Sequence, residues 1–430
     1  MKLSLRLFFL LFFAVSVTGL YASGGETDPQ ESDSSAEGVE AAYDPVGTVM
    51  DHIADANEVH FFGHFAMPLP VMLYAPGEGW TFGLSNMFHH GTEAVDGYVL
   101  NHGRVNKIAT PGFPEGHVKL AGDHPIHTEM MEVDGKEKEV GYIMHEGKKF
   151  MLDKPSTLDG GLLGGGITSF YDFSITKNVF TMLMAVVLLF LVFTGIARAY
   201  KKNEGKAPSG FQSFMEPIFL FIRDEVAKPM IGEEHYERFT PFIMSLFFFI
   251  LIINLMGLVP FLPGGTNVTG NLGVTMALAV IVFLVTNLNG KKDYWEHVFW
   301  MPGVPVFVKP VLAIVEILGL FIKPFSLMIR LFANISAGHI IILSLIGLIF
   351  VFGGNGESVG GATTGAVVGG LFTAFMNLIE LLVAFLQAFI FAMLAASYIG
   401  AAVEEHDHHD EDHAVEHGHG GAYAEAVAHH

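Results

Sequence analysis

Arg330 lies inside an apolar run, residues 311–352, that is long enough to cross a lipid bilayer. A guanidinium at bilayer depth costs about 2.5 kcal/mol on insertion scales, and estimates for an isolated helix exceed about 10 kcal/mol. A cation that is kept in such a place is by default a functional-site hypothesis. The sequence around it, residues 323–339, reads KPFSLMIRLFANISAGH and adds further polar side chains.

These polar side chains divide between two faces of a helix. At about 100° per residue, Ser326 and Asn334 fall within about 40° of Arg330. Glu316 lies 14 residues before Arg330 and falls on the same side of the helix as Arg330. His339 lies about 180° away and points to the opposite face.

The last apolar run, residues 371–403, carries a second polar stripe. Glu380, Gln387 and Tyr398 are spaced by 7 and 11 residues and lie within about 20° of one another on a helix. Two polar stripes that face each other within a membrane predict a path for protons. A histidine, a carboxylate and amides that hold water are groups that can pass a proton along it.

Arg330 has a different role, because a guanidinium is not deprotonated in proteins and relays nothing. We expect it to act electrostatically on a mobile carboxylate of a partner protein. The positive charge lowers the pKa of that carboxylate and releases its proton. It also stops protons from crossing directly between the two sides. In an alternative interpretation, Arg330 pairs with Glu316 or Glu380 and only holds helices together.

The composition is that of a membrane protein. Of the 430 residues, 51% are hydrophobic and 16% are charged. The net charge of −21 resides mostly in the polar N-terminal third and the C-terminal tail, so nucleic acid is not an expected partner. The sequence contains no cysteine, which excludes disulfides and thiolate sites. It also lacks a GxxxxGK[ST] phosphate-binding motif, so ATP must be handled by partner subunits.

The N-terminal part reads as an exported region. Residues 1–22 have the charged start, apolar centre and small-residue end of a secretory signal peptide. Residues 23–44 are an acidic, disordered linker. Residues 45–165 predict a small exported α+β or β-rich domain, with an amphipathic helix at 45–56 and a hairpin turning at Asp134-Gly135. Its many histidines lack metal-ligand spacing, which favours surface histidines over a metal site.

The remainder predicts a mainly α, polytopic membrane domain, residues 166–403, with about five spans. The predicted spans are 176–199, 240–262, 272–289, 311–352 and 371–403. Lysines and arginines after the first and third spans place those ends in the cytoplasm. The last two helices are long, and the fourth exceeds what an upright span needs, so it is tilted, kinked or curved.

Three connecting segments complete this topology. Residues 207–239 predict an amphipathic helix on the cytoplasmic surface, and the Gly-rich residues 353–370 predict an outside segment. Residues 404–430 form a cytoplasmic tail rich in His, Asp and Glu. We favour a tail that is solvated, and loose metal binding by its histidines and carboxylates is the alternative.

The run KPFSLMIRLFANISAGH, followed by Glu380, LLVAFLQAFIF and EEH, resembles subunit a of the F-type ATP synthase membrane sector. The likeness covers roughly residues 165–406 and includes NLMGLVP and NLGVTMALA. The predicted signal peptide and exported domain, which the family pattern does not include, point to a bacterial inner membrane with the N-terminal domain in the periplasm. The resemblance implies a stator. Such a stator forms two half-channels against a ring of c subunits, joins b-type peripheral stalk subunits, and has no cofactor and no catalysis of its own.

The resemblance also assigns roles to individual residues. Arg330 matches the essential arginine of the family, and Asn334 and Gln387 match polar residues beside it. Glu316 and Ser326 match positions of the cytoplasmic half-channel and the ring-facing surface. Many bacterial relatives have an acid at the position of His339 and a histidine at that of Glu380. The exchange retains one carboxylate and one imidazole in the outer half-channel.

Two other classes of function compete with this interpretation. A divalent-metal transporter would explain the 21 histidines, but only His339 falls within a span, and a buried arginine would not favour a cation site. A structural membrane scaffold would use the intramembrane charges only to join helices. The choice between proton and sodium stays open, because the ion binds to the partner's carboxylate.

Overall fold

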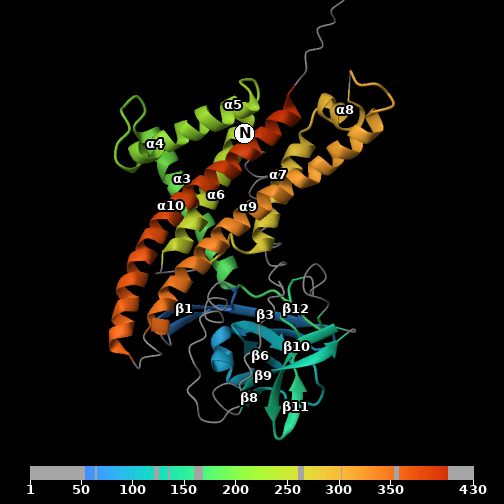
Figure 1. The fold of residues 1–430 in the computed structure, drawn as a ribbon, viewed down its shortest axis with the longest axis vertical. Helices are drawn as coiled ribbons and strands as arrows, with labels where there is room; N and C mark the ends of the chain where they lie inside the picture. Colours follow the sequence, from blue (N-terminus) through green and yellow to red (C-terminus); the bar gives the residue numbers. More distant parts are fainter. Residues whose placement is uncertain are drawn as a thin grey trace, which may run out of the picture.

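The computed structural model describes residues 54–62, 65–120, 125–133, 136–158, 168–259, 266–301, 303–352 and 358–404. A β-rich N-terminal domain lies at one end of the molecule, and long helices make up the rest (Figure 1). The predicted signal peptide, linker and C-terminal tail lie outside the described residues, as does most of the amphipathic helix expected at 45–56.

The N-terminal domain consists of four small antiparallel sheets. Their strands are β1 (Glu58–Phe62) with β2 (Phe65–Pro68); β12 (Tyr171–Asp172), β3 (Pro70–Ala75) and β4 (Gly79–Leu84); β7 (Arg104–Lys107), β6 (Tyr98–Asn101), β5 (Glu93–Val95) and β8 (His117–Lys119); and β11 (Lys148–Met151), β10 (Lys136–His145) and β9 (Ile126–Val133). A helical turn, η2 (Ser85–Gly91), follows β4. The prediction that this domain is rich in β-strands is confirmed.

Alternation along the strands builds the domain core. Val71, Leu73 and Ala75 on β3 are buried against Phe88 and Phe170, while the residues between them face outward. The predicted hairpin is present, because Lys136 of β10 pairs with Val133 of β9. The two turn residues themselves lie outside the described residues.

The helical part follows β12 directly. Its helices are α3 (Lys177–Lys202), α4 (Phe211–Phe221), η3 (Ile222–Ala227), α5 (Lys228–Ile231), α6 (Tyr236–Leu258), α7 (Leu272–Leu288), α8 (Lys292–Trp300), α9 (Lys309–Phe352) and α10 (Val359–Val403). Among the described residues, α3, α6, α9 and α10 are long and apolar enough to cross a membrane. Helices α7 and α8 add a fifth span if this pair, bent by 103°, counts as one.

Two predicted segment boundaries are wrong. Residues 207–239 do not form one helix, because the chain ends α5 at Ile231 and turns at Gly232, whose φ of +92° suits glycine. Residues 359–370 are not a loop but the first turns of α10. A Cβ at Gly369 would lie 2.7 Å from the Leu345 carbonyl oxygen, so this glycine lets α10 approach α9 closely.

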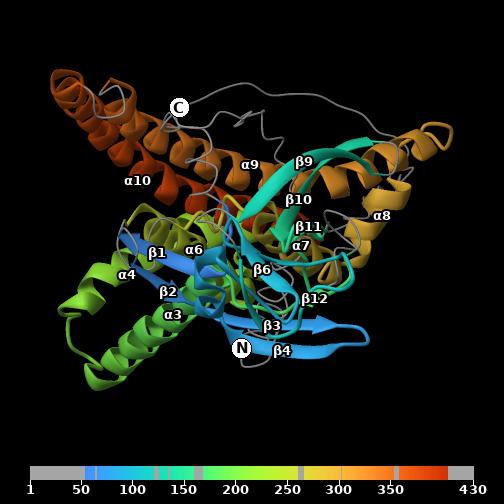
Figure 2. The same ribbon diagram turned by 90° about the horizontal axis from the view of Figure 1, so that it is seen from below.

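Helices α9 and α10 run side by side along their length in both views (Figures 1 and 2). Pro324 lies within α9 without ending the helix, although proline removes one backbone hydrogen bond there. Helix α6 packs against α10 on the inner side and buries Leu246, Phe247 and Phe249. The predicted long fourth and fifth spans are therefore the two helices that carry the polar stripes.

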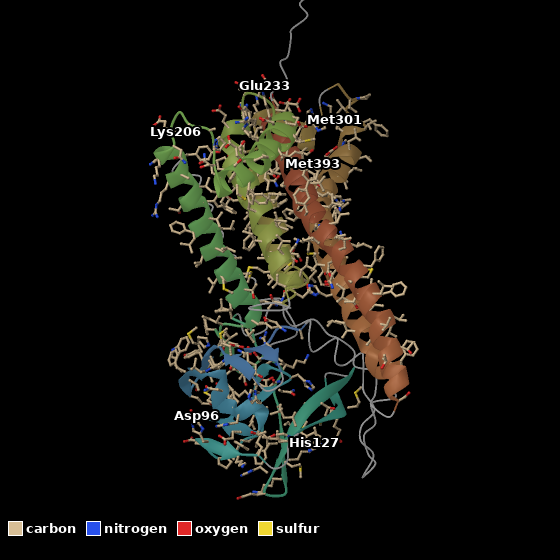
Figure 3. The ribbon with its side chains drawn as sticks, turned by 90° about the vertical axis from the view of Figure 1, so that its left-hand side faces the viewer. Asp96, His127, Lys206, Glu233, Met301 and Met393 are labelled. Atoms are coloured by element: carbon tan, nitrogen blue, oxygen red, sulfur yellow. The ribbon has the colours of Figure 1, made fainter. Side chains whose placement is uncertain are left out.

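The helical bundle has one end at the β domain and one end remote from it. Lys206 and Glu233 lie at the end of the bundle remote from the β domain, whereas Asp96 and His127 lie in the β domain at the other end (Figure 3). Helix α3 runs between these ends and finishes in Lys201 and Lys202. A positively charged end of this kind is typical of the cytoplasmic side of a span.

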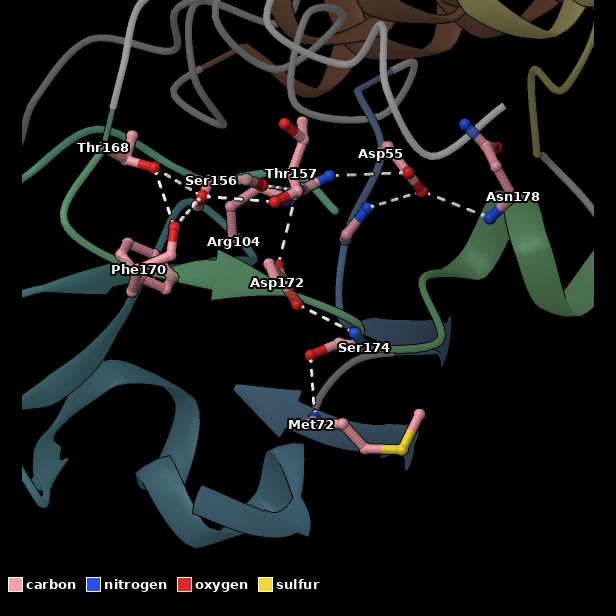
Figure 4. A network of polar contacts seen from close by, with 11 residues as sticks. Asp55, Met72, Arg104, Ser156, Thr157, Thr168, Phe170, Asp172, Ser174 and Asn178 are labelled. Atoms are coloured by element: carbon pink, nitrogen blue, oxygen red, sulfur yellow. Dashed lines mark hydrogen bonds and ion pairs between the residues drawn. The ribbon is translucent and has the colours of Figure 1, made fainter. Parts of the chain in front are cut away.

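A carboxylate of the β domain caps α3. Asp55 Oδ1 accepts hydrogen bonds from the backbone N–H of Ala56 at 3.0 Å and of Asn178 at 3.1 Å (Figure 4). The Lys177 N–H donates to the Ala56 carbonyl at 2.7 Å. Because an anion at a helix N-terminus is stabilised by the unpaired N–H groups and the helix dipole, this contact anchors the domain to the helix.

Arg104 on β7 joins this cap to the strand that enters the helix. Its guanidinium lies 3.5 Å from Asp55 and 3.6 Å from Asp172, and it donates to the Ser156 carbonyl at 3.1 Å (Figure 4). Asp172 in turn accepts the Ser174 N–H at 2.9 Å. The Arg104 side chain is 12% exposed and Asp172 only 3%, so this is a buried ion-pair network.

Candidate functional site

Arg330 lies near the middle of α9, with its side chain half-buried. One turn further on, the Asn334 side-chain amide donates a hydrogen bond of 2.7 Å to the Gln387 carbonyl oxygen on α10. Gln387 is 2% exposed. The structure thus joins two predicted site residues, Asn334 and Gln387, one helical turn after Arg330, and this amide pair links the two polar stripes.

His339 and Glu380 form a second contact between the same helices. His339 Nε2 lies 3.8 Å from Glu380 Oε1, and the two side chains are 13% and 3% exposed. Neither Glu380 oxygen has a hydrogen-bond partner among the described residues. A buried imidazole beside a carboxylate that is otherwise unbonded is suited to accept and pass on a proton.

Two glycines make room for this pair. A Cβ at Gly338 would lie 2.8 Å from Glu380 Oε1, and a Cβ at Gly257 on α6 would lie 3.5 Å from His339 Nε2. The histidine and the carboxylate therefore sit between α9 and α10, with Gly257 of α6 in contact with the imidazole. A larger side chain at Gly338 would displace the Glu380 carboxylate, whereas the distance at Gly257 is an ordinary van der Waals contact.

The segment of α9 nearer its start lines a hollow with α7, α8 and α10. Its walls are Val282, Phe283, Thr286, Asn287, Tyr294, Leu320, Lys323, Pro324, Leu327 and Tyr398. Tyr294 donates to Asn287 Oδ1 at 3.1 Å, and Lys323 Nζ lies 5.6 Å from the centre of the Tyr398 ring. Glu316 is close enough to Tyr294 to act on it electrostatically. Polar side chains from all four helices therefore line this hollow together with apolar ones.

The alternative interpretation of Arg330 requires an ion pair with a carboxylate. No ion pair joins Arg330 to Glu316 or Glu380 in the part of the chain that the structure describes. The interpretation of Arg330 as a simple ion-pair partner of these two carboxylates therefore lacks its expected contact. Ser326 is half-buried on α9 and has no hydrogen bond to another predicted site residue within the described ranges. It shares the Arg330 face by helix position alone.

One buried polar contact was not foreseen. Asn254 on α6 donates to the Ala384 carbonyl on α10 at 3.4 Å and accepts from the Thr269 hydroxyl at 2.8 Å. Ala384 lies between Glu380 and Gln387 along α10, so this contact positions both of them. The available signal was a single amide within the apolar sequence FFFILIINLMG, which is costly unless its hydrogen bonds are satisfied.

Within the described ranges, no three His, Asp or Glu side chains lie close enough together to hold a metal ion. The histidine-rich tail, for which loose metal binding was an alternative, lies outside those ranges.

Comparison with known proteins gives two family matches. Residues 179–400 match the family described as ATP synthase A chain, which is half of this chain. Residues 48–130 match a domain of unknown function (DUF8433).

Curated relatives match at substantial identity. ATP synthase subunit a of Chloroherpeton thalassium is 43% identical over 256 residues, which cover 56% of this chain and 71% of the relative. The Myxococcus xanthus ATP synthase subunit a is 40% identical over 277 residues, 63% and 85% of the two chains. The protein of that name from Anaeromyxobacter dehalogenans is 35% identical over 348 residues, 73% and 85% of the two chains.

Proposed function

Because this chain belongs to the ATP synthase A chain family, we propose that it is the proton-translocating stator subunit of an F-type ATP synthase membrane sector. The observation that carries the proposal is the separation of two polar contacts along α9 and α10. The Asn334–Gln387 amide pair accompanies Arg330, whereas the His339–Glu380 pair lies nearer the β domain.

The His339–Glu380 pair is assigned to the outer half-channel. Nine residues of α helix separate Arg330 from His339, a rise of about 13 Å. A proton that enters from the side of the β domain meets the imidazole and the carboxylate before it reaches the guanidinium. Asn334 and Gln387 then hold water or the partner's carboxylate in place beside Arg330.

The inner half-channel is assigned to the hollow on the other side of Arg330. Glu316 lies about 21 Å before Arg330 along α9. It is near Tyr294, which lines the hollow. In sequence, Ser326 lies between Pro324 and Leu327, which both line the hollow. Arg330 separates the two half-channels because its fixed charge repels a proton that is not carried on a partner's carboxylate.

The partner that carries the proton is assigned as the c-ring. The half of α9 around Arg330 exposes Ile322, Phe325 and Ile329, and α10 exposes a row of large apolar side chains. Such a surface suits sliding contact with apolar helices, whose carboxylate passes Arg330 as the ring turns. The b-type stalk subunits are the expected partners that hold the stator still. ATP chemistry then belongs to other subunits, and this chain is non-catalytic.

We further propose the inner membrane of a bacterium as the location, with the C-terminus in the cytoplasm and residues 45–165 as a periplasmic domain. Support comes from the basic end of α3 and from Lys291 and Lys292 at the same end of the bundle. Residues 1–22 are then the signal peptide, 23–44 a linker, 166–403 the membrane domain and 404–430 the tail.

Replacing Glu380 by glutamine is expected to slow ATP-driven proton pumping several-fold without loss of assembly. The amide retains the shape of the side chain but does not titrate, so the outer path keeps only the imidazole and water. Acidification of vesicles that contain the purified complex measures the rate, and Glu234→Gln at an exposed position is the control. An unchanged rate would mean that water alone suffices in the outer path.

Gly338→Ala is expected to slow pumping while the complex remains stable. The new methyl group would meet Glu380 Oε1, which can swing away as the end of a flexible side chain, but only by leaving His339. Gly319→Ala on the same helix is the matched control, because its Cβ meets nothing within 4 Å. Equal pumping by both variants at equal assembly would contradict the role of the His339–Glu380 contact.

The same assays separate this function from the metal-transporter alternative. We expect pumping by the native complex in chelator-treated, metal-free buffer to equal that in untreated buffer, apart from the Mg²⁺ that ATP requires. A strict requirement for another divalent metal, together with uptake of that metal, would favour the alternative.

A further inference from the structure

The outer face of the sheet β12-β3-β4 carries a cluster of aromatic side chains that pack on one another. Trp80 is at its centre, with ring centroids 5.0 Å from Tyr74, 5.4 Å from Phe82 and 5.2 Å from Phe173. The Tyr74 ring in turn lies 6.2 Å from Tyr171. We call these five residues the aromatic face.

The aromatic face is exposed and uncharged. Trp80 is 53% and Phe82 is 65% exposed, and Leu84 beside them is 46% exposed. Cross-strand pairing brings together Tyr74 with Trp80, and Met72 with Phe82, on the same side of the sheet. A contiguous apolar patch of this kind marks a protein or membrane contact on a water-soluble domain, because it is unfavourable in water.

The position of the face identifies the membrane as the contact. Phe173 precedes the first residue of α3 by four positions, so at most about 14 Å of chain separates them. The outward row continues from Tyr171 and Phe173 to Ile175, which packs against the apolar core of the membrane helices. The aromatic face is therefore continuous with a surface that is already in the bilayer.

The connection is also rigid. The Phe173 N–H donates to the Met72 carbonyl at 2.8 Å, and the Ile175 N–H donates to the Pro70 carbonyl at 3.0 Å. The Met72 N–H donates to the Ser174 hydroxyl at 3.0 Å. Together with the Asp55 cap on α3, these bonds fix the sheet relative to the span. The face cannot turn away from the bilayer without breaking them.

The arrangement of the elements leaves room for lipid above this face. Strands β3 and β12 lie on the side of the domain nearest the helices (Figure 1). Seen from below, the β3–β4 hairpin extends past the outline of the described helices (Figure 2). The hairpin therefore lies beside the bundle and on the side of the domain that is turned to the helices, where the headgroups of the surrounding lipids lie.

We infer that the aromatic face is a lipid-docking surface, which seats in the interfacial layer of the bilayer that α3 enters. Trp and Tyr prefer this layer because their rings are apolar and their N–H and O–H groups reach water or headgroups. The interface extends about 5 to 7 Å beyond the hydrocarbon core, a depth that the short link to α3 can match. The β domain is thereby held against the membrane at two points, at the start of α3 and at the aromatic face.

Site-directed spin labelling tests this inference, since the chain has no native cysteine. Phe82→Cys and Leu84→Cys each place a nitroxide on or beside the aromatic face. Met144→Cys is the matched control, because Met144 is 41% exposed on the hairpin formed by β10 and β11, at the far end of the domain (Figure 1). The full-length chain is reconstituted in vesicles of phosphatidylcholine and phosphatidylglycerol.

Power saturation then compares collisions with oxygen, which concentrates in lipid, and with a water-soluble nickel chelate. Labels at positions 82 and 84 are expected to collide more with oxygen than with nickel, and the label at 144 shows the reverse. If all three labels collide freely with nickel, the face is in water and the inference is wrong. If the labels at 82 and 84 are shielded from both reagents, another protein or a second copy covers the face, which also overturns it. Neither result depends on proton pumping, so it leaves the proposed function untouched.

Discussion

Arg330→Ala is expected to abolish ATP-driven proton pumping, while assembly of the complex persists. No described carboxylate neutralises the guanidinium by ion pairing, so its field is available to a passing partner. A positive charge within a few ångströms lowers the pKa of a carboxylate by about 1 to 3, which changes proton release about 10- to 1,000-fold. Without that release the ring carboxylate stays protonated at the discharge point and rotation does no work.

The same substitution is expected to raise passive proton leak. With the guanidinium gone, its charge no longer repels a free proton on the path between the hollow and the His339–Glu380 pair. The leak is measured as decay of an imposed pH gradient across vesicles that contain the membrane sector alone. If the Arg330→Ala variant pumps protons at the native rate, the proposed role of Arg330 is wrong.

Two further variants sharpen this test. Arg198→Ala removes an exposed arginine at the end of α3 and is expected to leave pumping unchanged. Arg330→Lys keeps the charge but lacks the planar fork, and an ammonium is more easily deprotonated when buried. We therefore expect pumping by Arg330→Lys to be weak and to fall further as the pH rises. If Arg198→Ala also abolishes proton pumping, the membrane domain has a general defect.

Arg104→Met is expected to destabilise the β domain by about 3 to 5 kcal/mol, because it leaves buried carboxylates without their counter-charge. Asp55 and Asp172 are only 7% and 3% exposed at their side chains, and both face the guanidinium. Loss of the pair also weakens the cap on α3. The measurement is protease resistance of the domain in the reconstituted full-length chain across a urea series.

The stability of the Arg104→Met variant is also expected to depend on pH. Burial raises the pKa of Asp172 above its ordinary value, and the Arg104 charge and the Ser174 hydrogen bonds partly offset that rise. An acid whose pKa is higher in the folded chain binds its proton more tightly when folded. Its contribution to stability is therefore lost as the pH rises from about 4 through the folded-state pKa. Removing Arg104 raises that pKa further, so acidification from neutral pH should restore more stability to Arg104→Met than to the native chain.

The controls follow from the network itself. Lys149→Met removes an exposed ion pair with Glu129 and should cost less than about 1 kcal/mol. Adding Asp172→Asn to Arg104→Met should recover stability and abolish the extra pH dependence, because the neutral amide needs no counter-charge. If Arg104→Met and Lys149→Met destabilise the β domain equally, the ion-pair network of Arg104 does not anchor the domain to α3.

Some features of the membrane domain could be read from local sequence because each span is a local property. The predicted spans agree with α3, α6, α7, α9 and α10. Most helix ends differ from the prediction by only a few residues. Residues 359–370 were missed because glycine is read as a loop signal in water, whereas in a membrane it allows close helix contact, as at Gly369. The break at Gly232 was missed because periodicity continues across it.

The site was predicted in part for the same reason. Helix periodicity placed Asn334 beside Arg330 and put His339 on the other face, but it could not say which residues meet across helices. That depends on how α10 is rotated and how closely it approaches α9, and therefore on Gly338 and Gly369. The Asn254 contact depends in addition on where the connection after α6 returns to the bundle.

The sequence by itself determined that Arg330 is a charge in a membrane and that two long helices carry polar stripes. Both follow from counting apolar residues and from the cost of burying a charge in lipid. Only the tertiary structure decided that Gln387 joins Asn334, that Glu380 joins His339, and that an aromatic face of the β domain is fixed next to α3. Those pairings join residues far apart in the chain, so they arise from helix packing and sheet order, which no local pattern specifies.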